Sequence, residues 1–497
     1  MEAQNSTVDR HISRRTLLSA TGAALAIPVL DGILPMQTNA SEEAIHAHSR
    51  PVAAGTKEHF ACRLAEYICN VRFDGLTPAV VARAKEQLIY HVALAFTGAL
   101  TMDGRQAMQI AGVLGGCSGQ STIIGQPRRV HPLEAAFVNS TFIRATGFDD
   151  VLFPSETHAG LLTFPTALAV AEQNHCSGEE FLVAIVTSYE VLGKMVTDQN
   201  EARAVRRPSM PFGPFAAVTA AARLMGLTTK QTANAIGYAA DSAMGLKEGN
   251  EQQPTHVYGW ISRNAITAAI LAQAGGETAP TILEGKYGFY ASLIGNAPNV
   301  DAIIERLGKD PEILRATQKR YPGTAMNIVP IQLILQLTQE HSLTAQNVAY
   351  VNIEIPSERS TFEDSYSTGP FPTHTQAASS LPFQTAIILL DGRINMSRYD
   401  ELDNPQILAV INKVSVKLAP HANPRYARVR ILTIDGKTLE CEGDNYVFPP
   451  IDAIESLSRD GDKFLPRSSL ERFAALAQDI ETLSDVSPLM RCLIPSR

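Results

Sequence analysis

The chain has 497 residues, of which 45% are hydrophobic and 19% are charged, and its formal net charge is −8. This composition excludes a wholly disordered chain, and the length predicts two domains rather than one core. The acidic balance argues against a nucleic-acid partner, because phosphate binding needs a basic surface.

The first forty residues carry the pattern of an export signal. Arg14 and Arg15 precede an apolar run from Leu17 to Leu30, and small residues follow at Thr38 to Ala40. This order is typical of a twin-arginine signal peptide, the alternative being a disordered terminus with a chance arginine pair. The apolar run is short and contains glycine and proline, so we expect no stable membrane insertion. We predict export to a periplasm-like compartment.

Helical patterns dominate the chain from residue 58 to residue 275. A break at 73–78 predicts that Thr77 caps a helix whose first residue is Pro78. Ser177 and Glu180 form a capping-box pattern at the start of another helix. Many of these segments carry small residues on several faces, which favours a packed all-helical domain. The predicted helices that follow the one beginning at Pro78 are 103–115, 132–146, 161–174, 177–196, 211–225, 229–244 and 261–275, and 118–125 is predicted to be extended.

The period of the pattern changes near residue 347. Residues 348–355 and 413–418 alternate like half-buried strands, and 382–390 between them is predicted to be a helix. Residues 428–434 and 437–442 predict a β-hairpin around a two-residue Asp-Gly turn. We therefore expect an inserted α+β domain over roughly 318–450. A last helix, capped at Ser468 and ending near 483, is predicted to return to the helical domain.

The densest group of ionisable side chains lies in the stretch 136–164. Apolar, helix-like sequence flanks this stretch on both sides, which predicts two core helices that meet at a polar turn. Such a turn is a suitable place for chemistry, although a solvated interhelical loop is the alternative. The ionisable side chains are Arg144, Asp149, Asp150, Glu156 and His158.

Several common catalytic motifs are absent. The sequence contains no Walker loop, no GxGxxG after a strand, no HExxH and no GxSxG. These absences argue against phosphate, dinucleotide, zinc-peptidase and serine-hydrolase functions. None of the six cysteines forms a CxxC pair, so no zinc or iron–sulfur site is expected.

A set of short motifs, in order along the chain, resembles the MmgE/PrpD family. The resemblance covers nearly all of the chain after the signal, and the combination is specific although each piece is short. The motifs are Asn139-Ser140-Thr141, Gly147-Phe148-Asp149-Asp150 with His158, GPFAAVTAAARLMGL from Gly213, Leu283-Glu284-Gly285 with Gly288-Phe289, Lys319-Arg320-Tyr321-Pro322, and Ser380-Leu381-Pro382-Phe383 with Asp391-Gly392-Arg393.

The resemblance implies a mainly α fold, in which both chain ends form a large all-helical domain that carries a smaller inserted α+β lid domain. We place the signal peptide at 1–40, the helical domain at 41–317 and 451–497, and the lid at 318–450. The resemblance also implies a homodimer that uses no metal and no organic cofactor. Family members of the methylcitrate dehydratase, cis-aconitate decarboxylase and iminodisuccinate epimerase types all move a proton on a carbon next to a carboxylate.

The sequence departs from the family pattern at several motif positions. Arg144 and Gly147 stand where the family usually has His and Asp, and Arg207 stands at another family His. A family Lys is lost near residue 254, and the His of that motif is displaced by one position to His256. Guanidinium is no general base at neutral pH, but it clamps carboxylates in a bidentate manner. We therefore expect both arginines to bind substrate carboxylates; the alternative is an internal ion pair.

We expect His158 to be the main proton carrier, because imidazole titrates near neutral pH and the residue takes the place of the family's active-site His. The alternative is a His bonded to the backbone of the turn. Asp149 and Asp150 are neighbours, so only one of them is expected to face the pocket. The further acid/base candidates are Tyr321, Asp150, Lys319 and His256, and the substrate-binding candidates are Arg144, Arg207, Asp149, Ser209 and Ser380.

These features predict a cofactor-independent lyase that acts on a small di- or tricarboxylate. Removal of a proton next to a carboxylate, followed by loss of water, is the first choice of reaction. Epimerisation and decarboxylation use the same groups and stay open as alternatives. A hypothesis from a different functional class is an exported protein that binds carboxylates without catalysis. The changed motif residues would explain the loss of catalysis.

Overall fold

The computed structural model describes residues 59–114, 119–153, 155–196, 209–243, 245, 255–295, 297–357, 363–444 and 453–495. The predicted signal peptide and Arg207 lie outside these residues. Within these ranges, no helix is long and apolar enough to cross a membrane.

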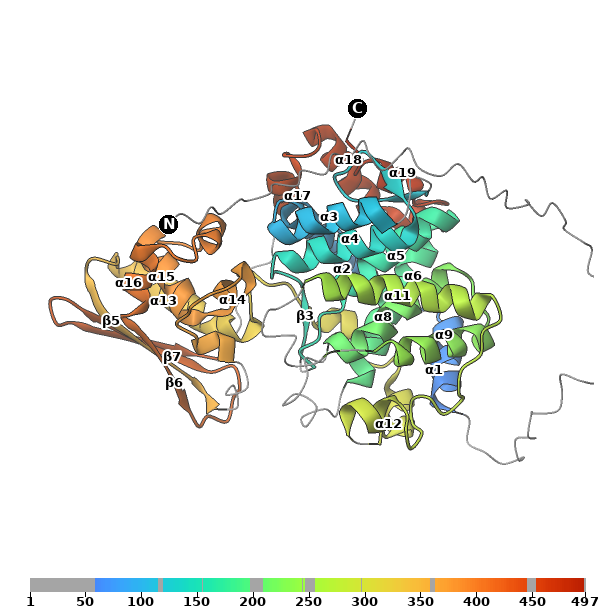
Figure 1. The fold of residues 1–497 in the computed structure, drawn as a ribbon, viewed down its shortest axis with the longest axis horizontal. Helices are drawn as coiled ribbons and strands as arrows, with labels where there is room; N and C mark the ends of the chain where they lie inside the picture. Colours follow the sequence, from blue (N-terminus) through green and yellow to red (C-terminus); the bar gives the residue numbers. More distant parts are fainter. Residues whose placement is uncertain are drawn as a thin grey trace, which may run out of the picture. The chain divides into compact units, whose positions relative to one another are not determined.

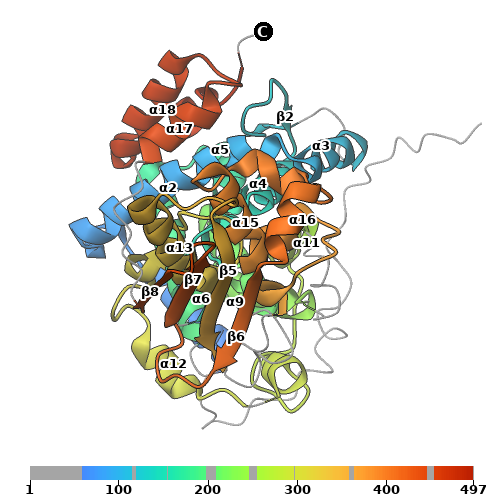
Figure 2. The same cartoon turned by 90° about the vertical axis from the view of Figure 1, so that its left-hand side faces the viewer.

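Helices form most of the described chain, and the first hydrophobic core lies among them (Figure 1). Helix α4 packs against α2, α5 and α11 (Figures 1 and 2). The C-terminal helices contribute Leu457, Phe473 and Leu489 to this same core. The mainly α fold is therefore confirmed. The helices here are α1 (Phe60–Asn70), α2 (Pro78–Ala99), α3 (Met102–Leu114), α4 (Pro132–Ala145), α5 (Gly160–Asn174), α6 (Gly178–Met195), α8 (Ser209–Leu224), α9 (Thr229–Asp241), α11 (His256–Gln273), α12 (Val300–Arg306), α17 (Ala453–Gly461), α18 (Arg467–Gln478) and α19 (Ser487–Arg491).

Local capping signals set several helix starts. Thr77 caps α2 by accepting a hydrogen bond from the Val80 N–H, and Ser177 forms the predicted capping box with Glu180 at the start of α6. The predicted cap at Ser468 is wrong. Helix α18 starts at Arg467, and Pro466 precedes it without a side-chain cap, because proline's fixed φ already suits the helix entry.

A second hydrophobic core lies in the region between residues 329 and 439. Its four-stranded sheet has the order β6-β5-β7-β8, with β5 and β6 parallel and the other pairs antiparallel. Helices α13 and α15 cover one face of the sheet (Figure 2). The elements are α13 (Ile328–His341), β5 (Val348–Pro356), α14 (His374–Ser379), α15 (Leu381–Asp391), α16 (Pro405–Ile411), β6 (Val414–Ala419), β7 (Ala427–Thr433) and β8 (Thr438–Gly443).

The predicted hairpin exists, but its turn is one residue longer than expected. Leu432 pairs with Thr438, and the Thr433 N–H donates to the Lys437 carbonyl. Three residues, from Ile434 to Gly436, therefore form the turn instead of two. Gly436 has φ of 85°, the left-handed geometry that closes three-residue hairpin loops.

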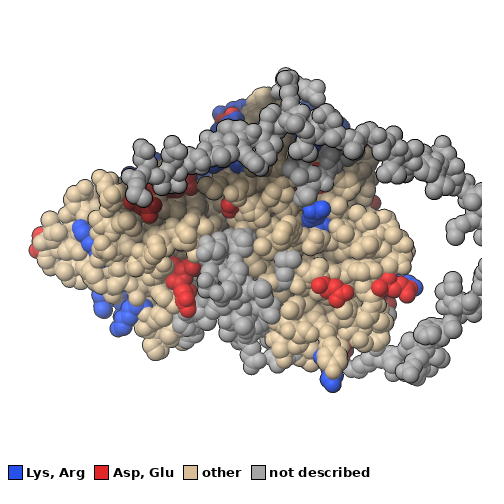
Figure 3. Space-filling model, viewed as in Figure 1, with Lys and Arg blue, Asp and Glu red and all other residues tan. Residues whose placement is uncertain are grey.

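Charged side chains on the visible face of the described chain do not gather into one basic surface (Figure 3). Acidic and basic groups instead alternate in small clusters over this face. This distribution fits the net charge of −8.

Candidate active site

The polar turn between α4 and α5 is joined to the segment that leads into α13. Strand β3 (Val151–Leu152) pairs antiparallel with β4 (Ala316–Thr317), and the Gly323 N–H donates to the Gly147 carbonyl at 3.0 Å. Gly147 has φ of 69°, and a Cβ there would lie 2.8 Å from the Gly323 nitrogen. Glycine at position 147 thus permits the contact, and the contact brings Lys319 and Tyr321 to the turn.

Asp149 is the centre of the cluster that results. Its side chain is fully buried, and its Oδ1 accepts a hydrogen bond from Arg144 Nη1 at 2.8 Å. Lys319 Nζ lies 3.6 Å from the same oxygen, and His158 Nδ1 lies 2.8 Å from Oδ2. Burial raises the pKa of Asp149, but the positive charges of Arg144 and Lys319 and the contact with His158 outweigh burial and hold the pKa well below its usual range. Asp149 is therefore a carboxylate at neutral pH.

Lys319 is buried against backbone carbonyl groups. Its ammonium donates to the carbonyl oxygens of Gly147 and Gly323, both at 3.1 Å. Burial lowers its pKa to about 8, against the opposing effect of Asp149. The Tyr90 hydroxyl lies 2.5 Å from the Phe148 carbonyl oxygen and 3.1 Å from that of Lys319, so α2 fixes both segments.

His158 is held in one tautomer. Its Nδ1 lies 2.7 Å from the Asp150 backbone carbonyl, with hydrogen-bond geometry, so Nδ1 carries the proton. Among the described residues, Nε2 has no hydrogen-bond partner, and the side chain is 18% exposed. Burial lowers the pKa of His158 and outweighs the nearby Asp149 carboxylate. The ring therefore presents an unprotonated Nε2 at neutral pH.

Asp150 points away from this cluster, as expected for a neighbour of Asp149. Its Oδ1 accepts from His91 Nε2 at 3.2 Å, and its Oδ2 accepts from the Tyr189 hydroxyl at 2.8 Å. Sequence reasoning missed His91 and Tyr189, which lie on α2 and α6. A polar His in the apolar run of α2 was the available signal.

The remaining sequence candidates take different places. The hydroxyl of Ser209 accepts the His158 N–H at 3.0 Å, so Ser209 holds the backbone of that residue. Tyr321 packs beside Val151 and Ile328 at the same turn, and burial raises the pKa of its phenol. The hydroxyl of Ser380 is engaged as the cap of α15 and donates to the Ser367 carbonyl.

His256 is not brought to the Asp149 cluster by any contact between described residues. Its ring stacks on Phe137 near the start of α11, with the centroids 6.4 Å apart, and its Nε2 is buried without a hydrogen-bond partner. The substrate role of Ser380 and the acid/base role of His256 therefore stay predictions without support from the geometry.

The cluster has spare capacity for an anion. Among the side chains in contact with Asp149, Arg144 and Lys319 carry two positive charges against its single negative charge, which leaves a surplus of one within this group. The neighbouring Asp150 carboxylate is outside this count, because it is bonded to His91 and Tyr189. The Arg144 Nε is buried and has no hydrogen-bond partner in the part of the chain that the structure describes, and the guanidinium lies 5.2 Å from the centre of the Tyr258 ring. Arg144 does form the ion pair with Asp149 that was the predicted alternative to substrate binding. This ion pair occupies the guanidinium through one hydrogen bond, which Nη1 donates. In the described part of the chain, no three His, Cys, Asp or Glu side chains are grouped to hold a metal ion.

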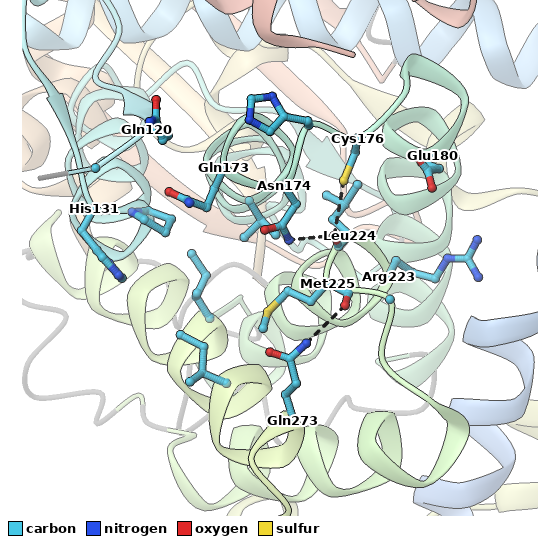
Figure 4. Close-up of a pocket in the computed structure, with 17 residues that line it drawn as sticks. Gln120, His131, Gln173, Asn174, Cys176, Glu180, Arg223, Leu224, Met225 and Gln273 are labelled. Carbon is cyan, nitrogen blue, oxygen red and sulfur yellow. Dashed lines mark hydrogen bonds between the residues drawn. The ribbon is translucent and has the colours of Figure 1, made fainter. Parts of the chain in front are cut away.

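A separate pocket of about 770 Å³ lies at the C-terminal ends of α5, α8 and α11 (Figure 4). Its polar groups complete helix termini: Asn174 Nδ2 and Cys176 Sγ both contact the Leu224 carbonyl, and Gln273 Nε2 contacts that of Met225. Arg223 donates to backbone carbonyls at the end of α1. The pocket has no part in the Asp149 cluster, which is the candidate active site.

Comparison with known proteins identifies the class. The MmgE/PrpD N-terminal domain model matches residues 62–300, and the MmgE/PrpD C-terminal domain model matches residues 321–447. The chain therefore belongs to the MmgE/PrpD family.

Two relatives are similar over almost their whole length. Cis-aconitate decarboxylase of Aspergillus terreus is 22% identical, over 88% of this chain and 97% of the relative. The cis-aconitate decarboxylase-like protein oryM of Aspergillus oryzae is 24% identical, over 86% of this chain and 95% of the relative.

Proposed function

We propose that the protein is a lyase that acts on a small di- or tricarboxylate by removing a proton next to a carboxylate. The observation that carries the proposal is His158, whose Nδ1 is bonded to a carbonyl while Nε2 has no hydrogen-bond partner among the described residues. The ring lies beside a cluster with surplus positive charge. Membership of the family and the names of its decarboxylase relatives support an enzyme that acts on carboxylates.

In the proposed reaction, His158 Nε2 takes the proton from the carbon next to a substrate carboxylate. The electron pair of the broken C–H bond moves toward that carboxylate, and the enolate-like charge develops there. Arg144 and Lys319 stabilise this charge, because they are held in place before the reaction begins and lie in a site with little water. Arg207 stays a predicted second carboxylate clamp.

The second half of the reaction needs an acid. In a dehydration, the electron pair forms the C=C bond as the C–O bond breaks, and the leaving hydroxide takes a proton to become water. Tyr321 is the proposed donor, because burial raises the pKa of its phenol and keeps it protonated. Lys319, with a pKa of about 8, is the alternative donor.

Decarboxylation is the second candidate, and the names of the fungal relatives favour it. Here the C–C bond to a carboxylate breaks, carbon dioxide leaves, and the electron pair is protonated at carbon. His158 would then act as the acid after first gaining a proton. Epimerisation and carboxylate binding without catalysis remain the other hypotheses.

An NMR assay, combined with measurement of carbon dioxide release and a thermal melt with each acid, separates these hypotheses. The full-length protein is incubated in D₂O with citrate, 2-methylcitrate or cis-aconitate, and proton spectra are followed together with carbon dioxide release. New olefinic signals without carbon dioxide support dehydration, and carbon dioxide release supports decarboxylation. Deuterium exchange with no other product supports an epimerase. A raised thermal midpoint without exchange supports a binding protein, and no effect of any acid contradicts the proposal.

The pH profile of kcat/KM is expected to be bell-shaped. His158 must be neutral to accept a proton, and its lowered pKa places the acid limb below about 6.5, the ordinary imidazole value. Lys319 must be charged, so activity falls as the pH rises through about 8. Lys319→Arg keeps the positive charge and is expected to remove the alkaline limb. An unchanged alkaline limb in that variant would show that another group causes it.

The homodimer and the periplasmic location stay predictions. Mass measurement in solution and fractionation of the producing cells test them.

A further inference from the structure

Asp150 is bonded on every side, although the sequence suggested an acid/base role for it. Its side chain is fully buried, and its Oδ1 accepts hydrogen bonds from His91 Nε2 at 3.2 Å and from the Gly160 N–H at 3.0 Å. Its Oδ2 accepts from the Tyr189 hydroxyl at 2.8 Å. Burial raises the pKa of Asp150, but His91, Tyr189 and the Gly160 N–H hold it below its usual value. Each oxygen of this carboxylate therefore already accepts at least one hydrogen bond from the protein.

The donors around Asp150 are themselves fixed. The His91 Nδ1 lies 2.7 Å from the Gln87 carbonyl, so both ring nitrogens face acceptors, and the ring stacks on Phe164 at 4.8 Å. His91 and Tyr189 are both fully buried. A Cβ at Gly160 would lie 2.0 Å from His91 Nε2 and 2.7 Å from the Tyr189 oxygen, so only glycine fits between them.

The backbone carbonyl of Asp150 provides the link to the candidate base. It accepts the Nδ1 proton of His158 at 2.7 Å, and Asp149 Oδ2 lies 2.8 Å from the same nitrogen, so two acceptors hold the proton on Nδ1 and leave Nε2 unprotonated. Asp150 is anchored through its side chain, so its carbonyl cannot rotate away from His158 without breaking the bonds to His91 and Tyr189.

We propose that His91 and Tyr189 are positioning residues, which act through Asp150 to keep Nε2 of His158 unprotonated and correctly aimed. Asp150 then serves as the anchor of the base rather than as a proton carrier. The proposal rests on the proposed function, because it assigns these residues to the base of that reaction. It adds helices α2 and α6 to the machinery that prepares the turn.

Tyr189→Phe tests the proposal, because it removes one hydroxyl and nothing else. We expect kcat on the active carboxylate to fall by about ten- to a hundredfold with KM changed less than about twofold, as for a misplaced catalytic group. The ¹⁵N spectrum of histidine-labelled protein reports the tautomer, with the His158 signal assigned from its loss in His158→Ala. Wild type is expected to show a protonated Nδ1 and an unprotonated Nε2, and Tyr189→Phe a mixture of tautomers.

Tyr290→Phe is the matched control. Tyr290 is also fully buried, and its hydroxyl donates to the Met195 carbonyl at 2.9 Å, away from Asp150. This variant is expected to keep both kcat and the His158 signal. Equal losses in the two variants, or a wild-type tautomer and kcat in Tyr189→Phe, would overturn the proposal.

A second variant covers the case in which Tyr189→Phe does not fold. In His91→Gln, the glutamine side chain cannot contact the Gln87 carbonyl and the Asp150 carboxylate at the same time, as the imidazole ring does. We therefore expect the same fall in kcat and the same mixture of tautomers as in Tyr189→Phe. The tautomer measurement needs no substrate. If the wild type turns over none of the acids but shows the fixed tautomer, the proposed function fails while the positioning of His158 stands.

Discussion

Replacing His158 with alanine is expected to lower turnover by about 10²- to 10⁴-fold, the usual contribution of a general acid–base group. The reason is geometric: within the described chain Nε2 of His158 has no hydrogen-bond partner, and the side chain is partly exposed, whereas the carboxylates beside it are buried. The thermal midpoint should change little, because Asp149 keeps Arg144 and Lys319 as partners after the ring is removed. Steady-state kinetics and a thermal melt of the same preparation provide the two measurements.

Two further variants sharpen this test. His158→Asn keeps a hydrogen-bond donor near the position of Nδ1 and removes only the distal nitrogen, so it should be as inactive as the alanine variant. His175→Asn is the control: this exposed His also contacts an aspartate, with Nδ1 2.9 Å from Asp485 Oδ2, but lies outside the site. It should retain full turnover. Substantial turnover in both His158 variants would reject His158 as the base.

The helical elements were predictable from sequence because their signals are local. Thr77 with Pro78 and Ser177 with Glu180 each mark a helix start within four residues, and the structure contains both caps. The hairpin turn was not predictable to the residue. The backbone N–H of Ile434 donates to the Asn347 carbonyl, so a partner some ninety positions away in the chain helps to set the length of the loop.

The candidate site was predictable only in part, for a similar reason. Arg144, Asp149 and His158 lie close together in the sequence, in the polar turn between α4 and α5. Their density among apolar residues indicated the position of the site. The two side-chain donors to Asp150 come from 59 positions before it and 39 positions after it, and no local pattern connects them. Gly160 could have signalled this close approach, since a glycine that starts a buried helix often makes room for a neighbour.

The two adjacent aspartates of the turn have different partners and different roles. Asp149 faces two cations that have capacity left for a substrate, whereas Asp150 faces donors that are already saturated. His158 touches both residues, through the carboxylate of the first and the backbone carbonyl of the second. Substitution of the two aspartates should therefore have different consequences, with the loss of charge felt most at Asp149.

Asp149→Asn is expected to lower the free energy of unfolding by about 3–5 kcal/mol, because it leaves Arg144 and Lys319 buried without an anion. Asparagine has nearly the same shape, so the change reports charge rather than packing. The pKa of Asp149 is lower in the folded protein than in the unfolded chain, where it is about 3.9. Its contribution to the free energy of unfolding is therefore present above the unfolded pKa and is lost as the pH falls through the folded pKa. Urea titrations of the wild type and the variant at several pH values should show a difference that narrows in acid.

The double variant Asp149→Asn/Lys319→Met separates this cause from a general disturbance. Removing the unpaired ammonium should recover part of the lost stability, because the two residues lie 3.6 Å apart and their effects are coupled. Glu277→Gln removes one partner of the exposed ion pair with Lys230 and should leave the urea midpoint unchanged. If the double variant is no more stable than Asp149→Asn, the carboxylate does not act by neutralising Lys319. Arg144 alone would then balance Asp149, and the surplus positive charge assigned to the site would be lost.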